Sequence, residues 1–386
     1  MKLKYLLLFF LILSCKSNHN ALYEFDPRTL KENKITLSEI ADYITYIPLD
    51  NSNPFSLIYG PKYFINNTIY LSALNSGVIA FDRKGQYLRR IGSIGRGPGE
   101  YIYYYQFTVD DKSETVYVLD SNIIKVYSKT GNFLRSISLK EFGDMVVAVE
   151  FYNSRLFVTF ALQSVDNKYD WIILDTLGNL VKKKERTIPP FKSNWPISGG
   201  IYKFNNGIYN WNTFNDTVFS ILTDLNYGTS FLFSPGEHRI PRSEIKDILQ
   251  FKLYFNPNSV FETSRFLVIK YFYQNLIIAL IDKKSNVSYL TLLESGPTLL
   301  GDNLIGGIYN DFDGGLLFQP ENYFVENDRE YMVGLINAYQ IKALLKDNKF
   351  INLNPKYPER KKEFEKLANA LTETDNQVLM LVRLKK

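Results

Sequence analysis

The sequence predicts an all-β fold, a six-bladed β-propeller built from four-stranded antiparallel blades. Aromatic residues make up 15% of the 386 residues, with 28 Tyr and 28 Phe, and this composition favours strands over helices. Short runs of alternating apolar residues recur with a period of roughly fifty residues, and each run ends in a tight turn. Four antiparallel strands repeated at this period are typical of propeller blades, which bury both faces of each sheet by packing radially.

Three hairpins show the repeat most clearly. They read GVIAFDRKGQYLRRI (77–91), NIIKVYSKTGNFLRSI (122–137) and WIILDTLGNLVKKK (171–184). Each has a glycine in its turn, where a positive φ is needed. Together with a short strand pair upstream, each hairpin supplies strands a to d of one blade. Blades one to five are expected at residues 59–92, 102–138, 145–186, 200–233 and 258–292.

The sixth blade is expected to combine strands from both ends of the chain. YITYIPLD (43–50) supplies its outer strand and QVLMLVRLKK (377–386) its last strand, while LIGGIYNDF (304–312) and GGLLFQP (314–320) begin it. Helical periodicity over about 328–372 predicts two helices inserted into this blade. Closure by both termini removes an open sheet edge, and the propeller domain is expected to span 35–386.

The N-terminus has the pattern of an export signal. Two lysines precede a short apolar run that ends at Ser14-Cys15, and the run is far below the roughly 20 residues that span a bilayer. Cys15 is the only cysteine. We therefore expect a lipoprotein signal peptide over 1–14, diacylation of Cys15, and a polar tether over 15–34. The alternative is an ordinary signal peptide with an incidental cysteine. An exported protein anchored in the outer membrane is the predicted outcome.

The glycine-rich stretch IGSIGRGPGEY (91–101) falls between blades one and two. No Gly-Lys-Ser/Thr opens a helix here and no βαβ unit surrounds it, so a phosphate loop is disfavoured. We interpret it as an inter-blade crossing whose structural turn residues allow unusual backbone angles. These residues are Gly95, Gly97, Pro98 and Gly99. In an alternative interpretation, the crossing also presents Arg96, Glu100 or Tyr101 to a ligand.

Three segments carry a resemblance to a known family. They are ITLSEIADYITYIPLD (35–50), IAFDRKGQYLRRIGSIGRGPGEY (79–101) and DNQVLMLVRLKK (375–386). The chain resembles the six-bladed β-propeller lipoproteins of Gram-negative bacteria, which are related in architecture to NHL-repeat propellers. The resemblance implies the fold and export to the cell envelope. It implies no catalytic residues.

Ligands of propellers bind at the mouth of the central channel, which the d–a crossings and b–c loops surround. Aromatic rings beside carboxylates and amides suit a sugar, whose CH-rich face stacks on a ring while its hydroxyls take the polar groups. The candidate ligand-binding residues are Arg96, Glu100, Tyr101, Lys192, Trp195, His238, Arg242, Asn122 and Asp216. Tyr103 and Tyr105 are expected to pack in the core between blades.

Other chemistries are poorly supported by the sequence. The chain has two histidines, so we expect no metal site, and we also expect no cofactor. Its formal net charge of +5 is spread along the chain, so we expect no nucleic-acid partner. Asp311 and Asp313 are interpreted as part of a turn rather than a calcium loop. The leading hypothesis is a non-catalytic module that binds a glycan, a peptide or a partner protein. The alternatives are a hydrolase or lyase acting on saccharides or lactones, and a scaffold that docks through the helical insertion.

Overall fold

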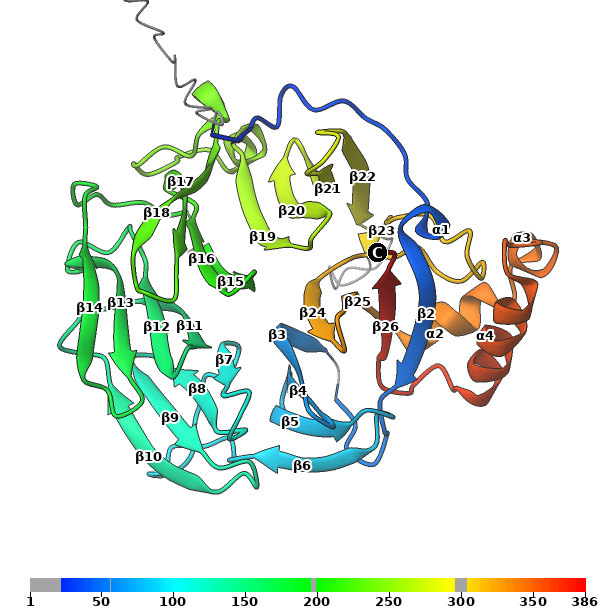
Figure 1. The fold of residues 1–386 in the computed structure, drawn as a ribbon, viewed down its shortest axis with the longest axis horizontal. Helices are drawn as coiled ribbons and strands as arrows, with labels where there is room; N and C mark the ends of the chain where they lie inside the picture. The colour runs from blue at the N-terminus through cyan, green and yellow to red at the C-terminus, as the bar shows by residue number, and fades with distance from the viewer. Residues whose placement is uncertain (1–21, 56, 196–198, 296–303) are drawn as a thin grey trace, which may run out of the picture.

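The computed structural model describes residues 22–55, 57–195, 199–295 and 304–386. Six sheets, each built on four antiparallel strands, are arranged around a common axis (Figure 1). The innermost strands of successive blades contact one another in ring order, so that the circle is closed. The prediction of an all-β, six-bladed propeller is confirmed.

The blades follow one another along the chain. Blade one contains β3 (Ile58–Ile65), β4 (Thr68–Ala73), β5 (Gly77–Asp82) and β6 (Tyr87–Ile91). Blade two contains β7 (Phe107–Val109), β8 (Val116–Asp120), β9 (Ile123–Tyr127) and β10 (Phe133–Ser138). Blade three contains β11 (Val146–Tyr152), β12 (Arg155–Phe160), β13 (Tyr169–Asp175) and β14 (Leu180–Glu185).

Blades four and five repeat the same order, and blade six draws on both ends of the chain. Blade four contains β15 (Gly199–Phe204), β16 (Gly207–Asn212), β17 (Asn215–Ile221) and β18 (Tyr227–Phe233). Blade five contains β19 (Asn256–Glu262), β20 (Phe266–Tyr273), β21 (Asn275–Asp282) and β22 (Ser288–Ser295). Blade six contains β24 (Asn322–Glu326), β25 (Arg329–Ile336), β26 (Val378–Leu384) and, outermost, β2 (Ala41–Pro48).

The turn between strands c and d of a blade lies against the outer strand of the preceding blade. Gly85, Gly131 and Gly178 have φ values of 84°, 89° and 99° in these turns. A Cβ atom on Gly85 would lie 2.1 Å from the carbonyl oxygen of Pro48, and one on Gly131 would lie 2.5 Å from that of Arg90. Glycine is therefore needed at this position for two reasons. Its backbone is left-handed, and the neighbouring blade leaves no room for a Cβ atom.

Blade six differs in detail from the expectation. Residues 329–336 form strand β25 rather than a helix. Met332 and Val333 point to opposite faces of the sheet, and both are fully buried because the blade is covered on both faces. The segment 304–320 supplies no strand to the blade: it forms β23 (Leu304–Ile305), which pairs with β22, and a bridge from Ile308 to Phe318. The expected closure is confirmed, since β2 pairs antiparallel with β26.

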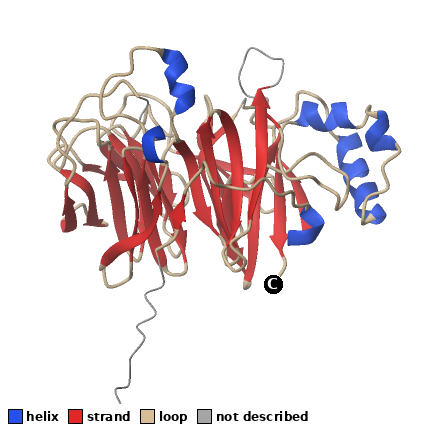
Figure 2. Ribbon diagram, turned by 90° about the horizontal axis from the view of Figure 1, so that it is seen from above, coloured by secondary structure: helices blue, strands red, loops and turns tan. Residues whose placement is uncertain are grey.

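The helical insertion connects β25 to β26 and lies to one side of the sheets (Figure 2). It contains α2 (Ala338–Leu344), α3 (Asn348–Ile351) and α4 (Pro358–Ala370). Phe364 of α4 is buried, and its ring lies 4.9 Å from that of Tyr46 on the outer strand β2. The Lys361 ammonium donates to the carbonyls of Phe350 and Ile351 at the end of α3 and to that of Leu353 just beyond it. The insertion is thereby fixed to blade six.

Residues 22–34, expected to be part of a polar tether over 15–34, lie against the outer edge of the ring. β1 (Glu24–Phe25) pairs in parallel with β18, the outer strand of blade four, and Asn33 forms a parallel bridge with Tyr289 of blade five. Phe25 is fully buried and its ring contacts those of Phe255 and Tyr271. The segment then enters α1 (Leu37–Ile40) and β2. We call residues 22–48 the belt, because they cross the outer edges of blades four, five and six (Figure 1).

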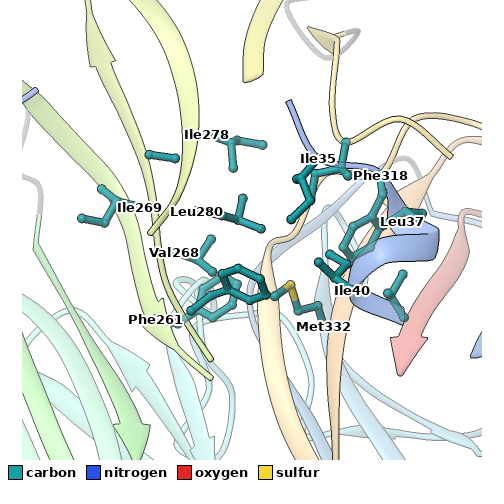
Figure 3. Close-up of a cluster of buried hydrophobic side chains, with 14 of the residues drawn as sticks. Ile35, Leu37, Ile40, Phe261, Val268, Ile269, Ile278, Leu280, Phe318 and Met332 are labelled. Atoms are coloured by element: carbon teal, nitrogen blue, oxygen red, sulfur yellow. The ribbon is translucent and has the colours of Figure 1, made fainter. Parts of the chain in front are cut away.

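The largest apolar cluster joins the belt to blades five and six. Figure 3 shows side chains of β20 and β21 directed toward α1 and β25. The labelled members are Ile35, Leu37, Ile40, Phe261, Val268, Ile269, Ile278, Leu280, Phe318 and Met332. Burial of these side chains, each worth roughly 1.5–3 kcal/mol when complete, holds the point of ring closure together.

Candidate ligand-binding surface

The glycine-rich crossing connects β6 to β7, as predicted, and it folds back on itself. Ile94 and Tyr101 form a bridge, and the Glu100 carboxylate accepts the backbone N–H of Gly97 at 2.8 Å. Its carbonyls meet blade two: Pro98 accepts from the Lys125 ammonium at 3.1 Å and Gly99 from the Tyr127 hydroxyl at 3.1 Å. The crossing therefore lies on the third and fourth strands of blade two, away from the innermost strand.

The turn residues of this crossing serve close packing more than unusual backbone angles. Gly92 has a left-handed φ of 65°, whereas Gly95, Gly97 and Gly99 do not. Gly95 and Gly97 lie against the Glu100 carboxylate, and a Cβ atom on Gly99 would lie 3.0 Å from the Phe133 ring. Glu100 is thus occupied within the loop, while Arg96 is exposed.

Tyr101 is not presented to solvent, contrary to its expected place in a ligand site. Its side chain is fully buried, its hydroxyl donates to the carbonyl of Ile91 at 2.6 Å, and it accepts the N–H of Val78 at 3.0 Å. Burial raises the pKa of the Tyr101 hydroxyl to about 12. The residue ties the crossing to blade one.

Tyr103 and Tyr105 are exposed, and the expectation that they belong to the core is wrong. Their side chains are 53% and 45% exposed. Strand β7 begins only at Phe107, because the Asp120 carboxylate accepts the N–H groups of Ile102 and Tyr103 at 3.2 and 3.0 Å and holds them in a loop. The alternation of a strand therefore does not apply to these tyrosines.

The loop that carries the two exposed rings is supported from below. Tyr104 is 5% exposed, and its hydroxyl accepts the backbone N–H of Asn75 at 3.0 Å. The carbonyl of Tyr105 lies against Gly60 of β3, which has a φ of 61° and no room for a side chain. The rings of Tyr105 and Tyr59 meet edge to face, with centroids 5.6 Å apart. The Tyr105 ring is thus held by its neighbours, and the backbone that carries Tyr103 is held by Asp120.

Polar groups continue from this loop to blade three. The Asn122 amide donates to the Asp144 carboxylate at 2.9 Å, and the Asp144 N–H donates to the Asn167 side chain at 2.6 Å. Asn122 follows Asp120 in the b–c loop of blade two. We call Tyr103, Tyr105, Asp120, Asn122 and Asp144 the tyrosine surface.

Trp195 lies in a different region and is buried. It is 6% exposed, and its ring centroid lies 4.6 Å from that of Phe251 and 6.2 Å from that of Tyr254. Its segment, 186–195, packs on the crossing from blade four to blade five, 234–255, which contains η1 (Gly236–His238) and η2 (Ile248–Leu253). We call these two segments the cap.

The other candidates near the cap mostly hold it on the blades. Asp216 and Arg239 form an ion pair; burial raises the pKa of the Asp216 carboxyl, and the Arg239 charge opposes that rise. Arg242 donates to the carbonyl of Phe214 at 2.9 Å. The His238 Nδ1 lies 3.0 Å from the carbonyl oxygen of Leu253, and its ring meets that of Tyr273. Lys192 is exposed. The structure thus separates the predicted residues into two regions.

Buried carboxylates along the inner strands escaped the sequence analysis. Glu150 on β11 is 7% exposed and accepts the Tyr63 hydroxyl at 2.7 Å, the Thr108 hydroxyl at 2.9 Å and the Lys203 ammonium at 2.9 Å. These partners come from the inner strands of blades one, two and four. Burial raises the pKa of Tyr63, so that it remains a donor. The sequence signal for this buried carboxylate is that Glu150 is the single charged residue in the otherwise apolar strand VVAVEFY (146–152).

Asp311 and Asp313 have protein partners, in agreement with a turn. Asp313 accepts the Tyr46 hydroxyl at 2.9 Å and the Gly315 N–H at 2.8 Å, and Asp311 accepts the Ser38 hydroxyl at 2.6 Å. In the part of the chain that the structure describes, no group of three or more His, Cys, Asp or Glu could hold a metal ion.

The expected export signal lies outside the described residues, and Cys15 with it. Of the helices that the structure describes, none has the length and apolar character needed to cross a membrane.

Several solved structures resemble this chain, among them two from Bacteroides. A protein of Bacteroides fragilis described as a candidate exported protein has a TM-score of 0.65 and 18% sequence identity, with 94% of this chain and 99% of that chain covered. A member of the DUF4221 family from Bacteroides vulgatus has a TM-score of 0.47 and 12% identity, with 92% and 100% covered. The first likeness supports the fold.

No match to this chain was found among curated proteins. One family model matches residues 22–383, from the start of the belt to the next-to-last residue of β26. The chain therefore belongs to the family described as a domain of unknown function, DUF4934.

Proposed function

We propose that this protein is a non-catalytic binding module, anchored by lipid at Cys15 outside the cytoplasm, which binds its ligand on the tyrosine surface. The observation that carries the proposal is the exposure of Tyr103 and Tyr105 on a loop that other side chains fix. Exposed aromatic rings on a rigid support bind with little loss of conformational entropy. A surface that only had to be soluble would gain nothing from two such rings.

The chemistry of the surface favours a saccharide. The faces of Tyr103 and Tyr105 suit the CH-rich face of a sugar ring, and the carboxylates and amide of Asp120, Asn122 and Asp144 suit its hydroxyl groups. The Asp120 carboxylate already accepts two backbone N–H groups, so that Asn122 and Asp144 would provide most of the polar contacts. A peptide or a partner protein would use the same two rings.

The proposal is tested by binding of a panel of neutral and acidic oligosaccharides and of peptides, followed by titration calorimetry. We expect the variant Tyr103→Ala/Tyr105→Ala to weaken binding of the active probe by about tenfold or more, since each aromatic contact is worth about 0.5–1.5 kcal/mol. Tyr227→Ala is the matched control, because Tyr227 is 47% exposed on the outer strand of blade four. Equal affinity of the double variant and the wild type, with equal melting temperatures, would exclude this surface. Binding of peptides alone would exclude the saccharide.

A further inference from the structure

The interface between blades three and four is apolar at one end and polar at the other. Toward the c–d turns, side chains of both blades form a buried apolar cluster, which consists of Phe157, Trp171, Ile173, Ile208 and Ile221. Toward the b–c loops lies a small gap with mainly polar walls, which we call the polar gap. Its polar lining residues are Thr159 and Asp170 of blade three and Asn210, Asn212, Asn215 and Thr217 of blade four.

A β-bulge turns the Asp170 side chain into the polar gap. The pairing of β13 with β14 shifts register between Tyr169 and Trp171, so that Asp170 is an extra residue on β13. An extra residue interrupts the regular alternation of side chains along a strand. Asp170 and Trp171 therefore both face blade four: Asp170 lines the polar gap, and the Trp171 ring meets that of Tyr227, with centroids 5.3 Å apart.

Two buried oxygen atoms of the polar gap have no hydrogen-bond partner within the part of the chain that the structure describes. They are Thr159 Oγ1 and Asp170 Oδ1, in residues that are 3% and 6% exposed. The other carboxylate oxygen of Asp170 accepts from the Lys184 ammonium. A buried polar atom without a hydrogen bond destabilises a fold, and the large majority of such atoms have a partner. The polar gap therefore needs a hydrogen-bonding group that the described chain does not supply.

The size and the charges of the polar gap restrict what this group can be. The gap has room for a group of about the size of a water molecule. Lys184 balances the charge of Asp170, so that a further cation or an anion would leave a net charge buried, which is unfavourable. A hydroxyl group is neutral, and its single oxygen can donate to Asp170 Oδ1 and also bond to the Thr159 hydroxyl.

We propose that the polar gap is a binding site for one neutral hydroxyl group, held between Asp170 Oδ1 and Thr159 Oγ1. The hydroxyl belongs either to a water molecule or to the end of a small polyol, because both present the same chemistry. No residue of the polar gap belongs to the tyrosine surface, so this inference stands apart from the proposed function.

The substitution Thr159→Val tests the proposal, because valine keeps the shape of threonine and lacks the hydroxyl. If a bound hydroxyl group bonds to Thr159 Oγ1, the substitution removes that hydrogen bond, and the ratio of folded to unfolded protein should fall by about fivefold. If Oγ1 has no partner, the substitution removes a buried unsatisfied atom, and the ratio should stay equal or rise.

Urea unfolding of the full chain measures this ratio. Thr229→Val, at an exposed position of β18, is the control for exchanging threonine for valine in a strand. A ratio for Thr159→Val that does not fall below that of the control would overturn the proposal. A crystal structure of the wild type should show an oxygen atom within hydrogen-bond distance of both Asp170 Oδ1 and Thr159 Oγ1, and a gap without one would also overturn it.

Glycerol distinguishes the two sources of the hydroxyl group. Its general stabilising effect, which comes from exclusion from protein surfaces, is common to the wild type and Thr159→Val. Binding of a glycerol hydroxyl in the polar gap would stabilise the wild type alone by mass action. We expect the difference between the two proteins to stay constant as glycerol is added, which assigns the hydroxyl to water. A difference that grows with the glycerol concentration would assign it to a polyol instead.

Discussion

The cap and the crossing 92–106 are both connections between blades, yet the cap buries Trp195 whereas the crossing exposes Tyr103 and Tyr105. The cap segments bring their own apolar partners for Trp195, including Ile188, Ile240 and Ile245. The crossing 92–106 is rich in glycine and polar residues, and its first part is taken up by contacts with blade two. An aromatic residue in a loop is buried when the loop and its neighbour supply a core, and is otherwise available for binding.

The largest effect is expected in the cap. Trp195→Ala should lower the free energy of unfolding of the cap by about 3–5 kcal/mol, because it leaves a cavity among Phe251, Tyr254 and Ile245. Hydrogen exchange over 186–195 and 234–255 measures this change, and binding at the tyrosine surface should persist. Unchanged protection of these segments would show that the cap is not a core of its own.

A smaller effect should distinguish Tyr101 from its exposed neighbours. Tyr101→Phe keeps the ring but leaves the N–H of Val78 and the carbonyl of Ile91 without their partner, which costs about 1–3 kcal/mol when such groups are buried. Tyr103→Phe is the control and should change stability by no more than about 0.5 kcal/mol. Urea unfolding of both variants provides the comparison, and equal stabilities would contradict a structural role for the Tyr101 hydroxyl.

The smallest effect concerns the pH dependence of the cap. Burial raises the pKa of Asp216 in the folded state, against the opposing charge of Arg239. A carboxyl group with a raised folded pKa favours folding at a pH below its unfolded pKa of about 3.9, and that contribution is lost as the pH rises through the folded value. The wild type should therefore lose stability relative to Asp216→Asn as the pH is raised from about 4.

The difference between the two unfolding free energies, measured across this pH range, isolates Asp216 because all other side chains are the same in both proteins. A difference that grows in favour of the wild type as the pH rises would reverse the assignment and make the Arg239 ion pair the dominant influence on the carboxyl.

The sequence was sufficient for the blades and insufficient for the placement of individual side chains. The c–d hairpins have a period, a turn glycine and alternating apolar residues, and the predicted blade bounds agree with the observed strands within a few residues. Residues 329–336 were assigned to a helix because a short apolar run fits both structures. In the structure these residues form a strand because they pair with β24 on one side and β26 on the other.

The sequence placed the candidate residues on the connections between blades, but it did not predict which of their side chains are exposed and which are buried. Whether Tyr101 or Tyr103 is exposed depends on the Asp120 carboxylate, which holds the backbone of 102–103 out of the strand. Trp195 is buried because of Phe251, a residue of the next crossing. Such contacts link segments that are distant in the sequence, and local patterns do not contain them.

The belt imposes an order on assembly. β2 pairs with β26 at the other end of the chain, and β1 and Asn33 add to the outer strands of blades four and five. During synthesis these N-terminal residues are made early, whereas their partners in blades four, five and six are made much later and β26 is made last. Phe25, Leu37 and Ile40 therefore wait without their burial partners while the ribosome completes the ring. Closure over nearly the whole chain length is the entropically costly step, and a chain truncated before β26 would leave the ring open with β2 unpaired.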